Sequence, residues 1–178
     1  MKTYVWPVGQ PDPVFATRFA AADVYEKALA SFIMVCADVV PYHAPSQTLL
    51  LAKRAQKPME HLWFYGGRVW IGERVTEAAL RHFAEDTGLR LTADRLQPLG
   101  VMDYLFHERQ QAPQNTPCHT HAHTFAVALT EAEITQWGGH VRAPEYLPGS
   151  LTRVTRAMAH AHPHPAVRDV YEALFPLA

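Results

Sequence analysis

Strand-like apolar runs alternate with amphipathic segments along the chain, so strands and helices are predicted in mixed order. Apolar runs rich in β-branched and aromatic residues predict strands at 32–42, 48–54, 96–108 and 118–129. The first two strands are separated by a short turn and predict a β-hairpin. Helical periodicity and capping residues predict helices at 23–31, 75–86, 130–137, 150–160 and 165–175. This order favours the α/β (α+β) class.

Length and composition are those of an ordinary globular domain. The chain has 178 residues, of which 48% are hydrophobic and 19% charged. Residues 1–30 predict an N-terminal arm and a short helix with Asp23 as its N-cap, and residues 31–178 predict the main domain with C-terminal helices. Two cysteines are too few for a disulfide framework.

Charge and hydropathy argue against two classes of partner. The net charge of −1 gives no basic surface for nucleic acid. No apolar run approaches the ~20 residues that a membrane span needs. The N-terminal sequence has no apolar core of the signal-peptide type, so a cytoplasmic location is expected.

The predicted helix at 75–86 brings three polar side chains together. His82, Glu85 and Asp86 are three and four positions apart, so they can converge on one helix face. Carboxylates at such spacing can hold a divalent cation. An ordinary amphipathic helix with a solvated acidic face is the simpler alternative.

Arg81 on the same helix lies within reach of two other carboxylates. Glu77 precedes it by four residues and predicts an i,i+4 pair, and Glu73 lies just ahead of the helix. Gly88 follows the last helical residues and suits the left-handed conformation of a helix C-terminus.

A long gapped pattern runs through this stretch, formed by Gly67, Glu73, Arg81, Phe83, Glu85, Asp86, Gly88 and Leu89. It resembles the box of Nudix hydrolases, Gly-x5-Glu-x7-Arg-Glu-U-x-Glu-Glu-x-Gly-U, where U is a bulky apolar residue. The resemblance extends over about residues 32–150 and implies a Nudix fold with a mixed β-sheet between helices.

The resemblance also implies a chemistry and roles for these residues. It implies hydrolysis of a nucleoside diphosphate linked to another moiety, with Mg²⁺ held by Glu85, Asp86 and the carbonyl of Gly67. Glu85 and Arg81 would belong to the catalytic centre. Glu73 would brace the loop and helix through Arg81.

The chain departs from the box at two positions. Asp86 replaces a Glu and shortens the carboxylate reach, and His82 replaces the Glu after the Arg. The remaining carboxylates suit one Mg²⁺ better than a cluster of ions. His82 as a ligand would favour Mn²⁺ or Zn²⁺. Its role stays open, and so does a catalytically inactive, nucleotide-binding protein.

A narrower resemblance rests on Lys53, Arg54, Pro58, Trp63, Phe64, Gly66, Gly67, Arg68 and Val69. The segment looks like the GDP-mannose mannosyl hydrolase branch of that family, whose members cleave a nucleotide sugar at its C–O bond and are dimers. The resemblance implies that Asp38, Arg54 and Arg68 bind substrate, that His140 is the base, and that a homodimer is possible. Gly139 and Thr124 depart from that branch. Cleavage of a P–O bond in another nucleoside di- or triphosphate is the alternative.

Two histidine-rich segments are further candidates for metal binding. His119, His121 and His123 point to one side of the predicted strand, because side chains alternate along it. They could bind Zn²⁺, lie near substrate, or form an exposed strand edge. The histidines between residues 159 and 165 are predicted to form a solvated turn.

Overall fold

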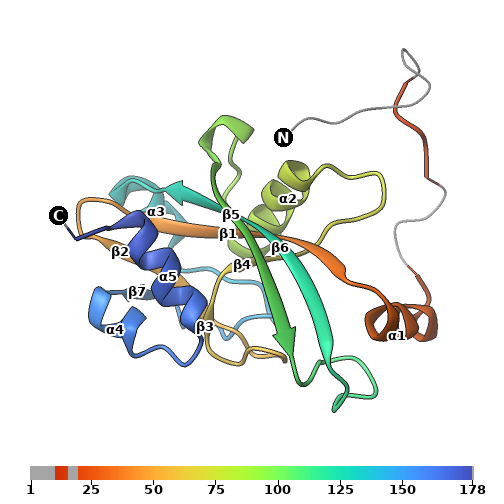
Figure 1. The fold of residues 1–178 in the computed structure, drawn as a ribbon. Coiled ribbons are helices and arrows are strands. Elements are labelled where there is room, and N and C mark those ends of the chain that lie inside the picture. Colours follow the sequence, from red (N-terminus) through yellow and green to blue (C-terminus); the bar gives the residue numbers. More distant parts are fainter. Residues whose placement is uncertain (1–10, 16–19, 178) are drawn as a thin grey trace.

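The computed structural model describes residues 11–15 and 20–177 (Figure 1). Most of the predicted N-terminal arm lies outside these residues. The described strands are β1 (Met34–His43), β2 (Thr48–Lys53), β3 (Leu62–Trp63), β4 (Tyr65–Arg68), β5 (Gln97–Phe106), β6 (Cys118–Ala128) and β7 (Thr152–Val154). The described helices are α1 (Ala22–Ser31), α2 (Val75–Thr87), the 3-10 helix η1 (Ala93–Arg95), α3 (Glu131–Trp137), α4 (Arg156–His160) and α5 (Pro165–Leu174).

The strands form a mixed sheet with β1 at its centre. The main order is β3-β2-β1-β6-β5, with β4 also paired to β1 and β7 to β2. β1 pairs with β6 in parallel and with β2 and β4 in antiparallel fashion, and the predicted β1–β2 hairpin is confirmed. β5 and β6 are antiparallel and reach beyond the rest of the sheet.

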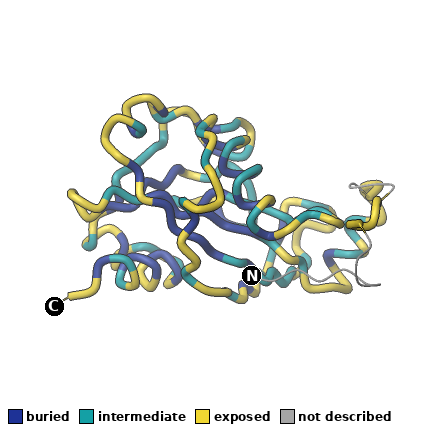
Figure 2. Tube along the Cα trace, turned by 90° about the horizontal axis from the view of Figure 1, so that it is seen from above, coloured by how far each residue is buried: buried dark blue, intermediate teal, exposed yellow. Residues whose placement is uncertain are grey.

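Alternate residues of β1 enter two apolar clusters on opposite faces of the sheet, which is why this strand is apolar on both sides. Ala37 and Val39 join the cluster that also holds the buried side chains of α2 and α3. Val40 joins the cluster that holds those of α5. The view from above in Figure 2 shows buried strands in the middle and more exposed helices around them. The expected mixed sheet between helices is therefore confirmed.

The predicted helix at 150–160 is wrong in its first half. Thr152–Val154 forms β7, which pairs with β2 through Leu49↔Val154, and only Arg156–His160 is helical. The free edge of β2 offers hydrogen bonds to this β-branched segment, and tertiary pairing overrides the helical pattern.

The first helix begins one residue earlier than predicted, and its cap differs. Ala21 is the N-cap, and Asp23 lies inside the first turn, where its charge still favours the helix N-terminus. The side chain of Leu29 is buried and packs this helix against the rest of the domain. No helix in the described ranges is long and apolar enough to cross a membrane.

Candidate active site

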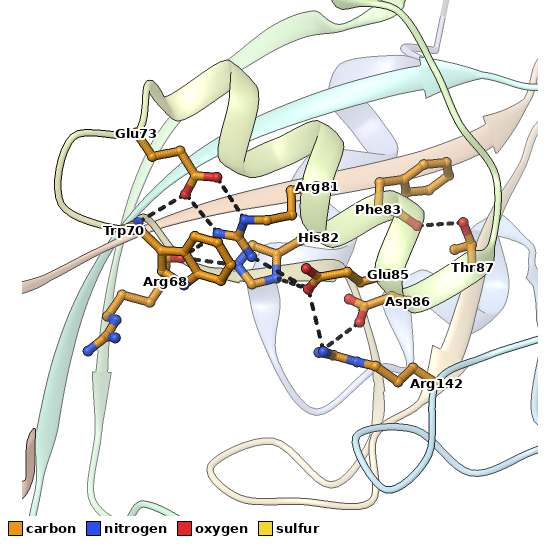
Figure 3. A network of polar contacts seen from close by, with 10 residues as sticks. All are labelled: Arg68, Trp70, Glu73, Arg81, His82, Phe83, Glu85, Asp86, Thr87 and Arg142. Atoms are coloured by element: carbon orange, nitrogen blue, oxygen red, sulfur yellow. Dashed lines mark hydrogen bonds and ion pairs between the residues drawn. The ribbon is translucent and has the colours of Figure 1, made fainter. Parts of the chain in front are cut away.

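Arg81 on α2 is the centre of a polar network that ties the helix to the loop before it (Figure 3). Its Nε and Nη2 donate to the two oxygens of Glu73, each over 2.7 Å, and Nη2 also donates to the carbonyl of Arg68. The guanidinium lies 3.5 Å from the ring centre of Trp70. Burial alone raises the pKa of Glu73, but hydrogen bonds from Arg81 and from the Trp70 amide leave that pKa below its ordinary value.

The predicted Glu77–Arg81 pair is wrong, whereas the contact between Glu73 and Arg81 forms as expected. Glu77 instead pairs with Arg74, 3.0 Å away, and accepts the Arg74 amide as part of a capping box. The carboxylate of Glu73 comes from a loop and approaches Arg81 with both oxygens, which a residue one helical turn away cannot match. Gly88 adopts φ 78°, the predicted left-handed conformation.

His82 lies behind the glycine pair of β4. Its Nε2 lies 3.0 Å from the carbonyl oxygen of Arg68, so Nε2 carries the proton and donates. Its Nδ1 is buried without a hydrogen-bond partner and lies 3.8 Å from Glu85. A Cβ at Gly67 would lie 2.7 Å from the His82 ring, which is why glycine is required there. Burial lowers the pKa of His82, so the imidazole is neutral at pH 7.

Glu85 and Asp86 converge on Arg142, which comes from the loop after α3 (Figure 3). Nη2 of Arg142 lies 2.9 Å from Asp86 Oδ1, and Nη1 lies 3.5 Å from Glu85 Oε2. Asp86 is fully buried, and neither of its carboxylate oxygens accepts a hydrogen bond from the described residues. Burial raises the pKa of Asp86 to about 7, although the charge of Arg142 opposes this rise.

These carboxylates fit a single divalent cation. In the part of the chain that the structure describes, no group of three or more His, Cys, Asp or Glu side chains could hold a metal ion. Both buried oxygens of Asp86 nevertheless accept no hydrogen bond from the described residues, and Arg142 brings a positive charge to Asp86 and Glu85, which shows that a cation can lie between them. Hard oxygen donors suit Mg²⁺ or Mn²⁺, with backbone carbonyl, water and substrate oxygens as the other ligands.

A cleft of about 260 Å³ lies beside this network. It is lined by the sheet, by α1 and by the loops after β2, between β5 and β6, and after α3. It brings together the predicted residues Asp38, Arg54, Arg68, Gly67 and His82, and Arg142 also lines it. Glu85, Asp86 and Arg81 do not line the cleft themselves. They are connected to it through Arg142, His82 and the carbonyl of Arg68.

Asp38 and the arginines supply opposite charges to the cleft. Asp38 is 7% exposed, and burial raises its pKa to about 7 against the opposing charge of Arg54. Arg54 forms an ion pair with Glu145. The guanidinium of Arg68 stacks on Tyr25 of α1, 4.4 Å from the ring centre. The cleft therefore offers several cationic donors to an anionic ligand.

His140 does not join these residues. It is exposed, and a Cβ at Gly88 would lie 3.9 Å from its Cδ2, so it lies near the C-terminal end of α2. Gly138 and Gly139 turn the chain with positive φ, and Arg142 is the nearby residue that reaches the cleft. Arg142 was not predicted, because nothing in its sequence spacing connects this loop to the box.

The histidines of β6 pair with a carboxylate on the neighbouring strand. Oδ1 of Asp103 lies 2.8 Å from Nδ1 of His121 and 3.2 Å from Nε2 of His119. These bonds lower the pKa of Asp103. The side chains of this site are partly exposed, but β6 lies between β1 and β5, so the predicted exposed strand edge is wrong. The His123 ring lies 5.7 Å from the His121 ring, centre to centre.

The connector between α4 and α5 is not the solvated turn that its sequence predicts. His162 and His164 are partly buried. The Nε2 of His162 lies 2.9 Å from the carbonyl of Leu62, and the His164 ring packs 4.9 Å from that of Trp63. His164 also caps α5 by accepting the amide of Ala166. These histidines attach the connector to Leu62 and Trp63 of β3.

Comparison with solved structures identifies the fold. The chain is similar to the E. coli dihydroneopterin triphosphate pyrophosphohydrolase, with a TM-score of 0.52, 19% identity, and coverage of 78% of this chain and 92% of that chain. It is similar to a MutT protein from Methanosarcina mazei Go1, with a TM-score of 0.58, 15% identity, and coverage of 80% and 92%. It is also similar to a C. elegans Ap4A hydrolase in a binary complex, with a TM-score of 0.50, 13% identity, and coverage of 79% of this chain and 94% of that chain. At these identities the likeness shows the fold alone.

A protein-family model provides the assignment. No curated protein matches the chain. The model described as "NUDIX domain" matches residues 33–167, which is more than half of the sequence. The matched residues include the box and the strands around it. This match confirms the expected fold and the expected class of hydrolase. The chain belongs to the NUDIX domain family.

Proposed function

We propose that this hydrolase cleaves a nucleoside diphosphate linked to another moiety, with Mg²⁺ or Mn²⁺ as the metal. A nucleotide sugar is the leading substrate class. One observation carries the proposal: the carboxylates of Glu85 and Asp86 converge at the side of a cleft that is lined by arginines. A diphosphate and its divalent cation match these two sets of charges.

Glu85, Asp86 and the carbonyl of Gly67 would hold the ion. When bound, such an ion neutralises phosphate charge and lowers the pKa of water. Arg54 and Arg68 bind phosphate oxygens with planar, bidentate forks. The Glu73–Arg81 pair is a positioning device, because it holds α2 against the Arg68 carbonyl.

Proton transfer falls to a group inside the cleft. Asp38 lines the cleft and has a pKa of about 7, which is near the ideal for a general acid or base at neutral pH. It can also accept a hydrogen bond from a sugar hydroxyl. His140 does not line the cleft, so we do not assign the role of general base to the loop after α3.

Cleavage of a P–O bond in another nucleoside di- or triphosphate is the second candidate. The printed names of two structural neighbours, a dihydroneopterin triphosphate pyrophosphohydrolase and an Ap4A hydrolase, favour it. A nucleotide-binding protein without turnover is the third, since His82 replaces an acidic residue of the box.

The test is ³¹P NMR with Mg²⁺ and a panel of nucleotide sugars in ¹⁸O-labelled water. Free sugar and nucleoside diphosphate without label on phosphorus indicate C–O cleavage. Nucleoside monophosphate and sugar phosphate, with label on phosphorus, indicate P–O cleavage. Glu85→Gln should abolish either activity, whereas Glu77→Gln on the same helix should keep it. Absence of turnover of every nucleotide sugar with Mg²⁺ and with Mn²⁺ would refute the leading substrate class.

A further inference from the structure

Arg109, in the loop between β5 and β6, is a buried cation without a counter-ion. It is 2% exposed and lines the cleft. Its Nε donates to the carbonyl of Gln111 over 3.3 Å, and its Nη2 donates to that of Ala112 over 3.1 Å. Its Nη1 is buried and has no hydrogen-bond partner, and no carboxylate of the described residues forms an ion pair with it.

The other cationic side chains that line the cleft each have a partner. Arg54 pairs with Glu145, Lys57 with Glu108, and Arg142 with Glu85 and Asp86, while Arg68 stacks on Tyr25. A buried charge without a partner is costly, and a buried unpaired donor adds to that cost. A purely structural role, in which Arg109 holds the loop carbonyls, leaves Nη1 unexplained.

Arg109 and Arg68 line the same cleft. Burial raises the pKa of Tyr25, and the nearby charges of Arg68 and Arg109 oppose that rise. Tyr25, on which the guanidinium of Arg68 stacks, lines the same cleft as both arginines. Figure 3 shows that the side chain of Arg68 points away from Arg142, Glu85 and Asp86.

We propose that Arg109 is an anion-binding residue that works with Arg68. The pair receives the phosphoryl group of a diphosphate that lies farther from Glu85 and Asp86. The identity of the ligand as a substrate rests on the proposed function, but the anion site itself does not. Such a site binds ligands with at least two linked phosphates more tightly than ligands with one phosphate.

The test is calorimetric binding of inorganic pyrophosphate and inorganic phosphate to the full chain in EDTA, without metal. Wild-type protein should bind pyrophosphate more tightly than phosphate. Arg109→Gln should weaken pyrophosphate binding about tenfold or more, because a charged hydrogen bond is lost. Arg168→Gln, an exposed arginine of α5, is the matched control and should bind as wild type does.

Each outcome decides the matter. Equal affinity of wild type and Arg109→Gln, or no pyrophosphate binding by wild type, overturns the proposal. If Arg109→Gln does not fold, Arg109→Lys replaces it, and this variant should keep part of the affinity because it keeps the charge but loses the planar fork. Arg109-dependent pyrophosphate binding without any turnover would support the anion site and refute the proposed function. Turnover together with unchanged pyrophosphate affinity in Arg109→Gln would support the proposed function and refute the anion site.

Discussion

Replacing Asp38 by Asn should stabilise the protein at neutral and alkaline pH. Asp38 lies in the central strand and is 7% exposed. Burial raises the pKa of its carboxyl from 3.8 to about 7, and Arg54 opposes this rise without cancelling it. The ionised form is therefore destabilising in the folded state. Asn has nearly the same shape and cannot ionise, so the variant removes this cost.

The sign and size follow from the two pKa values. Between 3.8 and about 7 the native state binds more protons at this site than the unfolded state does. Stability therefore falls as the pH rises through that window and is then constant. One pKa unit corresponds to about 1.4 kcal/mol, so the shift sets a ceiling of about 4 kcal/mol. Relaxation and water in the cleft reduce it, and about 1–3 kcal/mol is expected at pH 8.

The assay is urea unfolding of both proteins between pH 4 and pH 8. The difference in the free energy of unfolding should be near zero at pH 4 and should grow towards pH 8. Asp23→Asn on the exposed face of α1 is the control, and its difference from wild type should not follow this profile. A variant less stable than wild type at pH 8, or a difference independent of pH, would refute the reasoning.

Three other changes probe the network around Arg81, the proposed ion site and the cap of α5. Glu73→Gln removes the bidentate partner of Arg81 and should cost about 1–3 kcal/mol in urea unfolding, against less than about 0.5 kcal/mol for Glu77→Gln; equal losses would contradict the assigned pairing. His82→Glu adds a third carboxylate beside Glu85 and should tighten Mg²⁺ binding about tenfold by calorimetry, while unchanged affinity would place this position outside the ion's surroundings. His164→Ala removes the cap of α5 and should lower stability by about 1 kcal/mol, and no loss would show that the cap is dispensable.

The local half of the site could be predicted from the sequence. The gapped pattern around α2 fixed the helix, its C-terminal Gly88 and the contact between Glu73 and Arg81. These features depend on residues within one helix and the loop before it, although the Glu77–Arg81 pair that helical spacing predicts does not form. Strand lengths and the β1–β2 hairpin followed from apolar runs for the same reason.

The family resemblance placed Asp38, Arg54 and Arg68 at one site, and all three line the cleft, but the other long-range contacts could not be predicted. Arg142 reaches Asp86 from a loop far along the chain, and Arg109 reaches the cleft from another. Such contacts depend on how loops cross the sheet and leave no periodicity in the sequence. His140 shows the same limit, because a turn at Gly138 decides which residue of the loop faces the cleft.

Three charged groups of the described residues have unfavourable surroundings, and they lie in or beside the same cleft. Asp38 and Asp86 are carboxylates with pKa values raised by burial to about 7, and Arg109 is a buried cation without a counter-ion. By contrast, the pairs of Arg95 with Glu133 and of Arg156 with Glu172 are part-exposed, where burial costs little. A fold selected for stability alone would place apolar residues at those three buried positions. Their concentration around one cleft is typical of a site that a ligand completes, and the proposed divalent cation and diphosphate would together supply the missing charges.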